Sequence, residues 1–454
     1  MTYLISLNPA TGEPVGEIPT TSLDAIPALV CAARGARSNW SHLSIEARGE
    51  CLLRAAEDLL QESERLGELL SQEMGKPLRK GISEVRFCAQ SIEPRVKQAV
   101  AALQSRRSSD GDTESTLYYD PLGVCAVISP WNYPMSMPQW MLLPALLCGN
   151  TVLFKPSEET PLIAQAYADV LNRHLPPGVL QVVQGPDQQG RALVEADINM
   201  VAFTGSREAG KDIMTRAAVG LKRLMLELGG KDPLLVLDDA DLDAAAEFAC
   251  ANSFENAGQV CVATERVYVD RQVLDCFEQR VTERAAQYLA GPWHDAKSRL
   301  GPMIHDRQRQ HVLDQIEQAL ASGARLLHGG KDHPPRYITP TVLTDCRSDM
   351  WIMQQETFGP VLCIQGYDNL DEALFLANST EYGLGAVVFG EDEDRAWQVA
   401  RHLEAGMIGV NKSCFGTVEC PWVGARQSGY GFHGSAEGFH QFCQLRVVSK
   451  PLSG

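Results

Sequence analysis

Residues 150–175 read NTVLFKPSEETPLIAQAYADVLNRHL, a short apolar strand followed by a helical stretch. Two further apolar runs follow, LQVVQG at 180–185 and INMVAFTGS at 198–206, and the second leads into the helical stretch SREAGKDIMTRAAV at 206–219. Strands that alternate with helices at this interval indicate parallel βαβ units. The stretch therefore predicts an open, doubly wound α/β sheet, whose ligands lie at the carboxyl ends of the strands.

A second α/β block follows the first. It contains apolar strands such as DPLLVL at 232–237 and ERVYVD at 265–270, and a long helical stretch at 306–322. The first hundred residues show the periodicity of amphipathic helices instead. A chain of 454 residues is long enough for two or three domains. We expect one domain to comprise 1–102 and 122–229, and a second to comprise 230–424.

The C-terminal tail, GFHQFCQLRVVSKPL at 438–452, alternates apolar and polar residues before it reaches a proline. A late strand that follows a complete domain often pairs with another chain. We therefore interpret the C-terminal tail as an oligomerisation arm.

Composition argues against several classes of protein. The formal net charge of −17 opposes nonspecific binding to nucleic acid or to an anionic membrane, and the N-terminal residues lack the pattern of a secretory signal. The longest uncharged run, 121–154, is interrupted by Pro130, Pro134, Pro138 and Pro144, which would break a membrane helix, so a buried strand, loop and helix is the better interpretation. Thirteen scattered cysteines indicate free thiols in a reducing cytoplasm. Neither CxxC nor HExxH spacing occurs, so we expect no bound metal.

The stretch ENAGQVCVATER at 255–266 places Cys261 among residues with little bulk. Asn256, Ala257 and Gly258 let the backbone come close to another group, whereas a structural cysteine usually lies among large apolar neighbours. A thiol attacks carbonyl carbon well once it is deprotonated. Cys261 is therefore the predicted nucleophile, although a lone cysteine is more often a small buried hydrophobe.

Glu227 and Asn132 are the predicted partners of this thiol. Glu227 ends the apolar run in MLELGGKDP at 225–233, and two glycines follow it closely. A carboxylate partly buried at the ligand edge of the sheet would have a raised pKa and could act as a general base. Asn132 lies in SPWNYP, where two prolines stiffen the loop, and its amide could bind a developing oxyanion. Judged from its own stretch of sequence alone, Glu227 could equally be a carboxylate that caps a helix. Asn132 could likewise be a turn residue.

Three loops could receive a cofactor, although a GxGxxG motif is missing. In FTGSREAG at 203–210 a strand ends in a glycine, and Ser206 is suited to cap a helix whose N-terminus attracts phosphate. In FKPSEET at 154–160, Lys155 and Glu158 lie where an ammonium and a carboxylate can bind ribose hydroxyls. The loop QETFGP at 355–360 adds a carboxylate and an aromatic ring.

Taken in order, six stretches resemble the NAD(P)-dependent aldehyde dehydrogenase superfamily over nearly the whole chain. They are PWNYP, GNTVLFKPSEETP, FTGSREAG, LELGGKDP, NAGQVC and ETFGPV. The resemblance implies an aldehyde dehydrogenase-like α/β fold, with a doubly wound cofactor domain, an α/β catalytic domain and a small oligomerisation arm that comprises 103–121 and 425–454. It also implies a small-molecule aldehyde substrate, a homodimer or homotetramer, and NAD as the cofactor, with NADP as the alternative.

The resemblance further implies a role for each residue. Cys261 would attack the aldehyde to give a thiohemiacetal, whose oxyanion binds the Asn132 side chain and the Cys261 backbone N–H. Hydride transfer would leave a thioester, and water activated by Glu227 would hydrolyse it to a carboxylic acid. Glu158 would repel a 2′-phosphate and so favours NAD, unless it swings away. The residues implied to bind the cofactor are Trp131, Lys155, Ser157, Glu158, Gly205, Ser206, Leu228, Glu356 and Phe358.

The substrate is less well indicated. Trp140 stands where relatives that oxidise succinic semialdehyde often carry an arginine, which favours a neutral aliphatic or aromatic aldehyde, unless Trp140 is a core residue. The short N-terminus nevertheless resembles bacterial succinic semialdehyde dehydrogenases, so that activity is the alternative, with Arg426 as its anion anchor. The loop PWVGARQSG at 421–429 departs from the family's usual PFGG pattern, which leaves its geometry open. The expected pocket residues are Tyr133, Met137, Trp140, Val260, Val262 and Phe415.

Two other classes of function stay open. A thiol esterase or amidase normally needs a histidine base near its cysteine, and no histidine lies in the stretches that look catalytic. A noncatalytic binding or structural protein on the same fold would lack the nucleophile or the base, whereas Cys261, Glu227 and Asn132 are all present. Cys414 is a second cysteine that could trap Cys261 in a disulfide.

Overall fold

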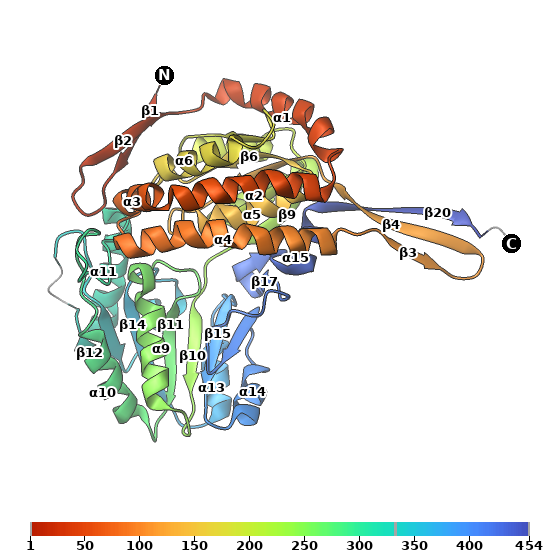
Figure 1. The fold of residues 1–454 in the computed structure, drawn as a ribbon. Coiled ribbons are helices and arrows are strands. Elements are labelled where there is room, and N and C mark those ends of the chain that lie inside the picture. Colours follow the sequence, from red (N-terminus) through yellow and green to blue (C-terminus); the bar gives the residue numbers. More distant parts are fainter. Residues whose placement is uncertain (1, 331–333, 453–454) are drawn as a thin grey trace.

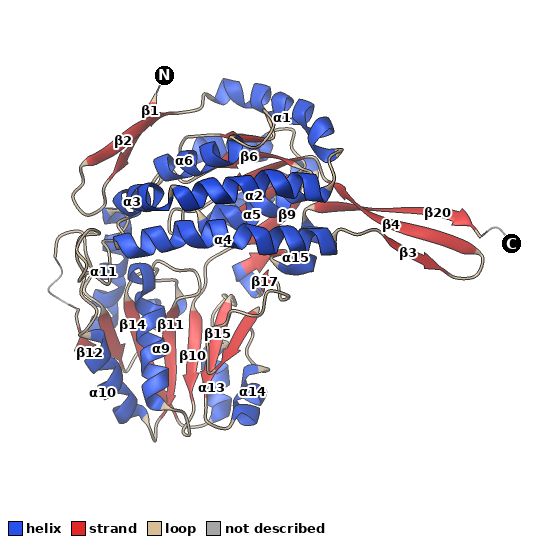
Figure 2. Ribbon diagram, viewed as in Figure 1, coloured by secondary structure: helices blue, strands red, loops and turns tan. Residues whose placement is uncertain are grey.

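The structure of the chain, a computed structural model, describes residues 2–330 and 334–452. Figure 1 shows two α/β blocks, one above the other, and a ribbon of strands that extends beyond them to one side and includes the C-terminal strand. Figure 2 shows that helices surround the strands of both blocks. The predicted α/β fold is confirmed.

The upper block is built on a sheet of six strands. They are β5 (Val124–Ile128), β6 (Thr151–Lys155), β7 (Leu180–Val182), β8 (Met200–Thr204), β9 (Arg223–Glu227) and β18 (Gly429–Tyr430). The spatial order is β18-β9-β8-β5-β6-β7, and all strands except β18 run parallel. The chain therefore winds outward from β5 in both directions, as the doubly wound prediction requires.

Both faces of this sheet are buried. Cys125 and Val127 of β5 point into one apolar cluster, and Val124 and Ala126 point into another, because side chains alternate along a strand. The first cluster includes residues of α2 (Ile45–Gln61), α3 (Ser63–Met74), α4 (Leu78–Ala102), α5 (Ser136–Leu147) and α6 (Pro161–Asn172). The second cluster includes residues of α1 (Ile26–Ser41), α7 (Asp187–Glu195) and α8 (Arg207–Ala217).

The uncharged run 121–154 folds into β5, a loop, α5 and β6, as predicted. Eleven of the twelve residues of α5 are buried, and the remaining one is Trp140. Within residues 2–330 and 334–452, no helix is both long and apolar enough to cross a membrane. Trp140 is therefore the one position of α5 that is left for contacts outside the core.

The lower block is built on a second sheet, of seven strands. They are β10 (Asp232–Val236), β11 (Thr264–Asp270), β12 (Arg325–His328), β13 (Thr341–Thr344), β14 (Val361–Tyr367), β15 (Gly385–Phe389) and β16 (Met407–Val410). The order is β12-β13-β14-β11-β10-β15-β16, and only the pair β12 and β13 is antiparallel. The helices of this block are α9 (Leu242–Phe254), α10 (Leu274–Ala285), α11 (Asp306–Ala321), α12 (Trp351–Gln354), α13 (Leu370–Ala377) and α14 (Glu393–Ala400). Cys261 precedes β11 and Glu227 ends β9, so the site lies where the carboxyl edge of the first sheet meets the amino edge of the second.

The projecting ribbon in Figure 1 consists of β3 (Arg106–Ser109), β4 (Thr113–Pro121) and β20 (Cys443–Pro451). The tail strand β20 pairs antiparallel with β4 of the same chain along nine residues, from Cys443 to Pro451. It forms one edge of this three-stranded sheet. The role of the ribbon in oligomerisation stays a prediction.

Four short strands and one short helix lie outside the two large sheets and the ribbon. They are β1 (Tyr3–Leu7), β2 (Pro14–Pro19), β17 (Trp422–Val423), β19 (Phe432–His433) and α15 (Ser435–Gln441). Between residue 425 and β20, the chain pairs β18 with β9 and packs α15 against α4. These contacts tie the segment to the upper block, and the division into domains stays a prediction.

Candidate active site

The Cys261 loop is built by a close approach of two backbones. Asn256, Ala257 and Gly258 have left-handed φ values of 51°, 56° and 72°, which turn the chain sharply after α9. A Cβ added to Gly258 would meet the carbonyl oxygen of Gly359 at 2.0 Å. The lack of bulk in ENAGQVC therefore lets this loop pack directly on the backbone of the QETFGP loop.

Glu227 is hydrogen-bonded to Cys261. The thiol Sγ donates to Glu227 Oε1 at 3.2 Å, and Glu227 Oε2 accepts from Thr204 Oγ1 at 3.1 Å. Glu227 is the last residue of β9 and is only 3% exposed. Burial, followed by the charge of Glu227, raises the pKa of the Cys261 thiol well above its ordinary value. The resting sulfur is therefore a thiol, and its proton is directed at the carboxylate.

Asn132 faces the Cys261 loop from the other side. Its Nδ2 donates to the carbonyl oxygen of Gln259 at 3.0 Å, and its Oδ1 accepts from the backbone N–H of Tyr133 at 3.1 Å. Its own carbonyl oxygen accepts from Asn256 Nδ2 at 3.0 Å. The side-chain amide is thus held still, and one of its two hydrogens is engaged by Gln259.

A buried ion pair supports the Asn132 loop. Lys76 Nζ lies 2.7 Å from Glu84 Oε2, and both side chains are only 3% exposed. Lys76 also donates to the carbonyl oxygen of Asn132 at 3.0 Å. Glu84 Oε1 accepts from the backbone N–H groups of Met135 and Ser136, each at 3.1 Å. Glu84 thus satisfies orphan donors at the start of α5. Sequence reasoning missed this pair because α3 and α4 showed only amphipathic periodicity.

His433 was also missed. Its ring is 3% exposed, its Nε2 lies 3.5 Å from Glu227 Oε2, and the ring stacks on Trp422 with centroids 6.0 Å apart. Neither ring nitrogen has a hydrogen-bond partner among the described residues. No histidine lies in the stretches of sequence that look catalytic, but the fold brings His433 to the carboxylate of Glu227 rather than to the sulfur. Only its place in β19, paired with β17, brings it there.

A cavity of about 580 Å³ opens in front of Cys261. Its wall is largely aromatic and apolar. The lining includes all six predicted pocket residues, Tyr133, Met137, Trp140, Val260, Val262 and Phe415, together with Met407, Trp422 and His433.

The same cavity has charged walls that the sequence did not predict. Its cationic lining residues are Lys76, Lys80, Arg95 and Arg299, and its anionic ones are Glu84 and Glu255. Lys76 is paired with Glu84, and Lys80 Nζ lies 2.8 Å from Glu255 Oε2. Pairing therefore neutralises both carboxylates and leaves an excess of positive charge.

The residues predicted to bind a cofactor lie mainly along the carboxyl edge of the first sheet. Lys155 ends β6, and its Nζ lies 3.2 Å from Glu158 Oε2. Ser206 follows β8 and caps α8, with its Oγ accepting from the Ala209 N–H at 3.3 Å. A carboxylate, an ammonium and a helix N-terminus on one edge are groups that suit the hydroxyls and phosphates of a dinucleotide.

Three further predicted cofactor residues shape the same edge. Ser157 Oγ accepts from the backbone N–H of Glu159 at 3.2 Å. Gly205 stands between β8 and Ser206. Leu228 packs on α8 at Gly210, where an added Cβ would meet Leu228 Cδ2 at 2.5 Å. Gly210 thus brings the helix close to the strand that carries Glu227.

The QETFGP loop carries Glu356 and Phe358, the remaining residues of this loop that were predicted to bind the cofactor. Phe358 meets the Trp131 ring edge to face, with centroids 5.5 Å apart. Glu356 Oε1 accepts from the Gly230 N–H at 3.2 Å, and burial raises the pKa of Glu356 to about 8. Glu265 fixes this loop, because its carboxylate accepts from the Thr357 and Phe358 N–H groups, each at 2.8 Å.

Arg426 and Cys414 were also named from the sequence. Arg426 donates to the carbonyl oxygen of Asn378 at 2.8 Å and does not belong to the lining of the cavity. It is therefore not the anion anchor proposed from the sequence. Cys414 lies in an apolar cluster against which Cys261 packs, and both are free thiols. Over the part of the chain that the structure describes, no three His, Cys, Asp or Glu side chains gather as a metal site.

Known proteins share this architecture. The model of the aldehyde dehydrogenase family matches residues 2–448. Betaine aldehyde dehydrogenase from Sinorhizobium fredii is 39% identical, over 98% of this chain and 93% of its own length. The crystal structure of an aldehyde dehydrogenase from Brucella melitensis biovar abortus is 32% identical and superposes with a TM-score of 0.96, over 100% of this chain and 95% of that one. A lactaldehyde dehydrogenase from Escherichia coli is also 32% identical, with a TM-score of 0.95, over 99% and 96% of the two chains.

Proposed function

The chain belongs to the aldehyde dehydrogenase family, and from that premise we propose that it oxidises an aldehyde to a carboxylic acid with Cys261 as nucleophile, Glu227 as base and Asn132 as oxyanion donor. The observation that carries this proposal is the hydrogen bond of 3.2 Å from Cys261 Sγ to Glu227 Oε1. A protonated thiol needs a base within reach, and the chain supplies one.

The first step is attack on the aldehyde. Glu227 accepts the thiol proton, and the sulfur forms a bond to the carbonyl carbon while the C=O electron pair moves to the oxygen. The oxyanion is held by the Cys261 backbone N–H and by the hydrogen of Asn132 that Gln259 does not engage. The fixed amide therefore acts where negative charge develops.

The second half of the reaction releases the acid. A dinucleotide held on the edge of the first sheet would supply the hydride acceptor, and loss of hydride from the carbon that bears sulfur would leave a thioester on Cys261. Glu227, after it returns its first proton to solvent, takes a proton from water, and the hydroxide adds to the thioester carbon. The carbon–sulfur bond then breaks, and the sulfur recovers a proton as the thiol. The net reaction consumes one aldehyde, one water and one oxidised cofactor.

Lys155, Glu158, Ser206, Glu356 and Phe358 would hold that dinucleotide. Glu158 is 35% exposed at its side chain, so its carboxylate is available to ribose hydroxyls and repels a 2′-phosphate. We propose NAD as the preferred cofactor. The ion pair of Lys155 with Glu158 supports this preference, because it already neutralises the ammonium that would otherwise attract the phosphate of NADP.

The aromatic and apolar wall supports an aldehyde whose chain near the carbonyl is apolar, either aliphatic or aromatic. Betaine aldehyde is a second candidate, since the 39% identical relative carries that name and Tyr133, Trp140 and Trp422 offer rings that could bind a trimethylammonium group. The excess positive charge of the lining opposes it. An aldehyde without a cationic group is therefore favoured.

The assembly follows from the projecting ribbon. We propose that β20 mediates formation of a homodimer or homotetramer, because Leu445, Val447 and Val448 are each about half exposed or more on an edge strand. We also propose that the protein works in the cytoplasm, where its free thiols would stay reduced. Light scattering of the purified protein tests the first proposal, and a monomer would overturn it.

The experiment that tests the function is a survey of NADH and NADPH formation. Acetaldehyde, hexanal, benzaldehyde, succinic semialdehyde and betaine aldehyde would each be supplied with NAD and with NADP. Turnover with NAD, absent from Cys261→Ala, supports the proposal. A chain that reduces neither cofactor with any of these aldehydes would contradict it.

A further inference from the structure

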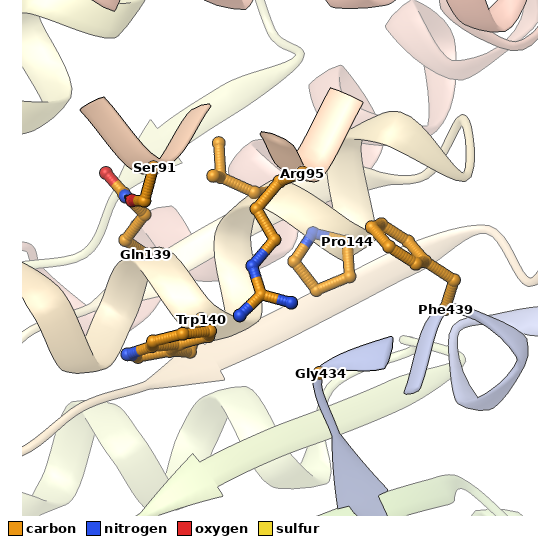
Figure 3. Close-up of a pocket in the computed structure, with 8 residues that line it drawn as sticks. Ser91, Arg95, Gln139, Trp140, Pro144, Gly434 and Phe439 are labelled. Carbon is orange, nitrogen blue, oxygen red and sulfur yellow. The ribbon is translucent and has the colours of Figure 1, made fainter. Parts of the chain in front are cut away.

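Arg95 is an arginine that the proposed reaction does not use. It lies on α4, and its side chain extends across Trp140, as Figure 3 shows. The guanidinium carbon stands 4.1 Å from the centroid of the Trp140 ring. Arg95 and Trp140 both line the cavity that contains Cys261, so the cation faces the same space as the nucleophile.

Arg95 is charged, largely buried and not neutralised. Burial lowers the pKa of its guanidinium to about 10, which leaves it a cation at neutral pH. Its one side-chain hydrogen bond within residues 2–330 and 334–452 goes from Nη1 to Gln98 Oε1, at 3.0 Å. The carboxylate closest in sequence, Glu93, is exposed and bonded to Lys97 at 2.6 Å.

The other cations of the cavity differ from Arg95. Lys76 and Lys80 each have a glutamate partner. Arg299 is exposed, so water solvates it. Arg95 alone among these four combines burial with the absence of a carboxylate partner in the described structure. A desolvated cation without a counterion is costly, and an anion that enters the cavity would remove that cost.

The surroundings fit a carboxylate. The flat guanidinium is fixed by the Trp140 ring beneath it and by Gln98, whose own Nε2 donates to the Val418 carbonyl oxygen at 2.6 Å. Gly434 leaves room beside it, because even an added Cβ would stay 3.8 Å from Arg95 Nη1. A preoriented guanidinium with free N–H groups can bind the two oxygens of a carboxylate together.

We propose that Arg95 binds a carboxylate at the far end of the substrate, so that the substrate class is an aldehyde that also carries a carboxylate. This inference rests on the proposed oxidation at Cys261. The carbon chain of such a substrate lies along the aromatic wall, with its aldehyde at Cys261 and its anion against Arg95. The arginine occupies a face of the Trp140 ring that a trimethylammonium group would need.

The test compares two aldehydes in the wild type, Arg95→Met, Arg95→Lys and Lys97→Met. Succinic semialdehyde carries the anion, and hexanal does not. We expect Arg95→Met to lower the ratio of kcat/KM for succinic semialdehyde to that for hexanal by about 100-fold, mainly through KM. Arg95→Lys should restore part of the ratio, and Lys97→Met, an exposed neighbour on the same helix, should leave it unchanged.

A binding measurement separates this inference from the proposed function. Calorimetric titration of succinate into Cys261→Ala should give binding that is lost when Arg95→Met is added, whether or not the wild type is active. Failure of the wild type to oxidise any of the five aldehydes of the survey above would refute the proposed function alone. An unchanged kcat/KM ratio in a folded Arg95→Met, or succinate binding that survives the substitution, would overturn the role of Arg95.

Discussion

The two ends of the aldehyde cavity differ in how their charges are balanced. At the reactive end, Glu227 is hydrogen-bonded to Cys261 and Thr204. Lys76, paired with Glu84, donates a hydrogen bond to the carbonyl oxygen of Asn132. At the far end, Arg95 rests on a tryptophan ring and one amide oxygen. At the first end, hydrogen bonds within the protein hold the thiol, the carboxylate and the Asn132 loop in place, whereas the second end leaves a cation without a counterion for a ligand to supply.

This difference separates chemistry from recognition. Groups that act on the reacting carbon must be held in place before substrate arrives, because reorganisation would raise the barrier. A group that selects the substrate gains by being unsatisfied until the correct partner binds. The comparison predicts that substitutions at the reactive end act on kcat, and that substitutions at the far end act on substrate preference.

The largest effect is expected at the nucleophile. Cys261→Ala should lower kcat by roughly 10⁴-fold or more, because no thioester can form. The matched control is Cys276→Ala, an exposed cysteine on α10, which should keep full activity. Steady-state NADH formation measures the activity of both variants. Normal turnover by Cys261→Ala would show that Cys261 is not the nucleophile.

The next largest effect is expected on stability, when the ion pair that supports the Asn132 loop is broken. Lys76→Met leaves Glu84 buried without its counterion, and the free energy of unfolding should fall by about 3–5 kcal/mol. Lys80→Met breaks a partly exposed ion pair, with side chains 44% and 38% exposed, and should cost less than about 1 kcal/mol. Denaturant unfolding monitored by fluorescence compares the two variants. Equal losses would mean that the buried pair does not have the role assigned to it.

A smaller effect is expected on the reactivity of the Cys261 thiol. The negative charge of Glu227 and its hydrogen bond both raise the pKa of Cys261, so Glu227→Gln should lower that pKa. More thiolate is then present at pH 8, and iodoacetamide should modify Cys261 several-fold faster in the variant. In the wild type, the rate should keep rising beyond pH 9. Peptide-resolved mass spectrometry measures the rate, and the exposed Cys31 serves as an internal reference. Slower modification in Glu227→Gln would contradict this.

The part of the site that could be predicted from sequence lies at strand ends and tight turns. Glu227 ends an apolar strand, and Cys261 comes shortly after a turn that contains Asn256 and Gly258, the residue types that adopt a left-handed backbone most readily. Such positions depend on local chain geometry, which short stretches of sequence encode. The doubly wound sheet was predictable for the same reason, because its strands and helices alternate in order.

The residues that escaped prediction depend on contacts between distant segments. Glu84, Cys88, Ser91 and Arg95 are spaced four, three and four residues apart, so they share one face of α4. This stripe packs on α5, where Gln139 Nε2 donates to the Cys88 carbonyl oxygen and to Ser91 Oγ. A polar stripe within an amphipathic helix was the available signal, but only the tertiary fold shows that Glu84 and Arg95 line the cavity. His433 had no comparable signal.

The most direct test of the central claim is to trap the acyl group on Cys261. In Glu227→Gln the lower pKa of Cys261 supplies thiolate without the base, so the variant, incubated with NAD and an aldehyde that the wild type oxidises, should form the thioester and hydrolyse it slowly. Intact-protein and peptide mass spectrometry should then show one acyl group on the peptide that contains Cys261, absent without NAD. Acylation of a different cysteine, or an active wild type whose Glu227→Gln variant never carries an acyl group and still turns over normally, would contradict the assignment of nucleophile and base.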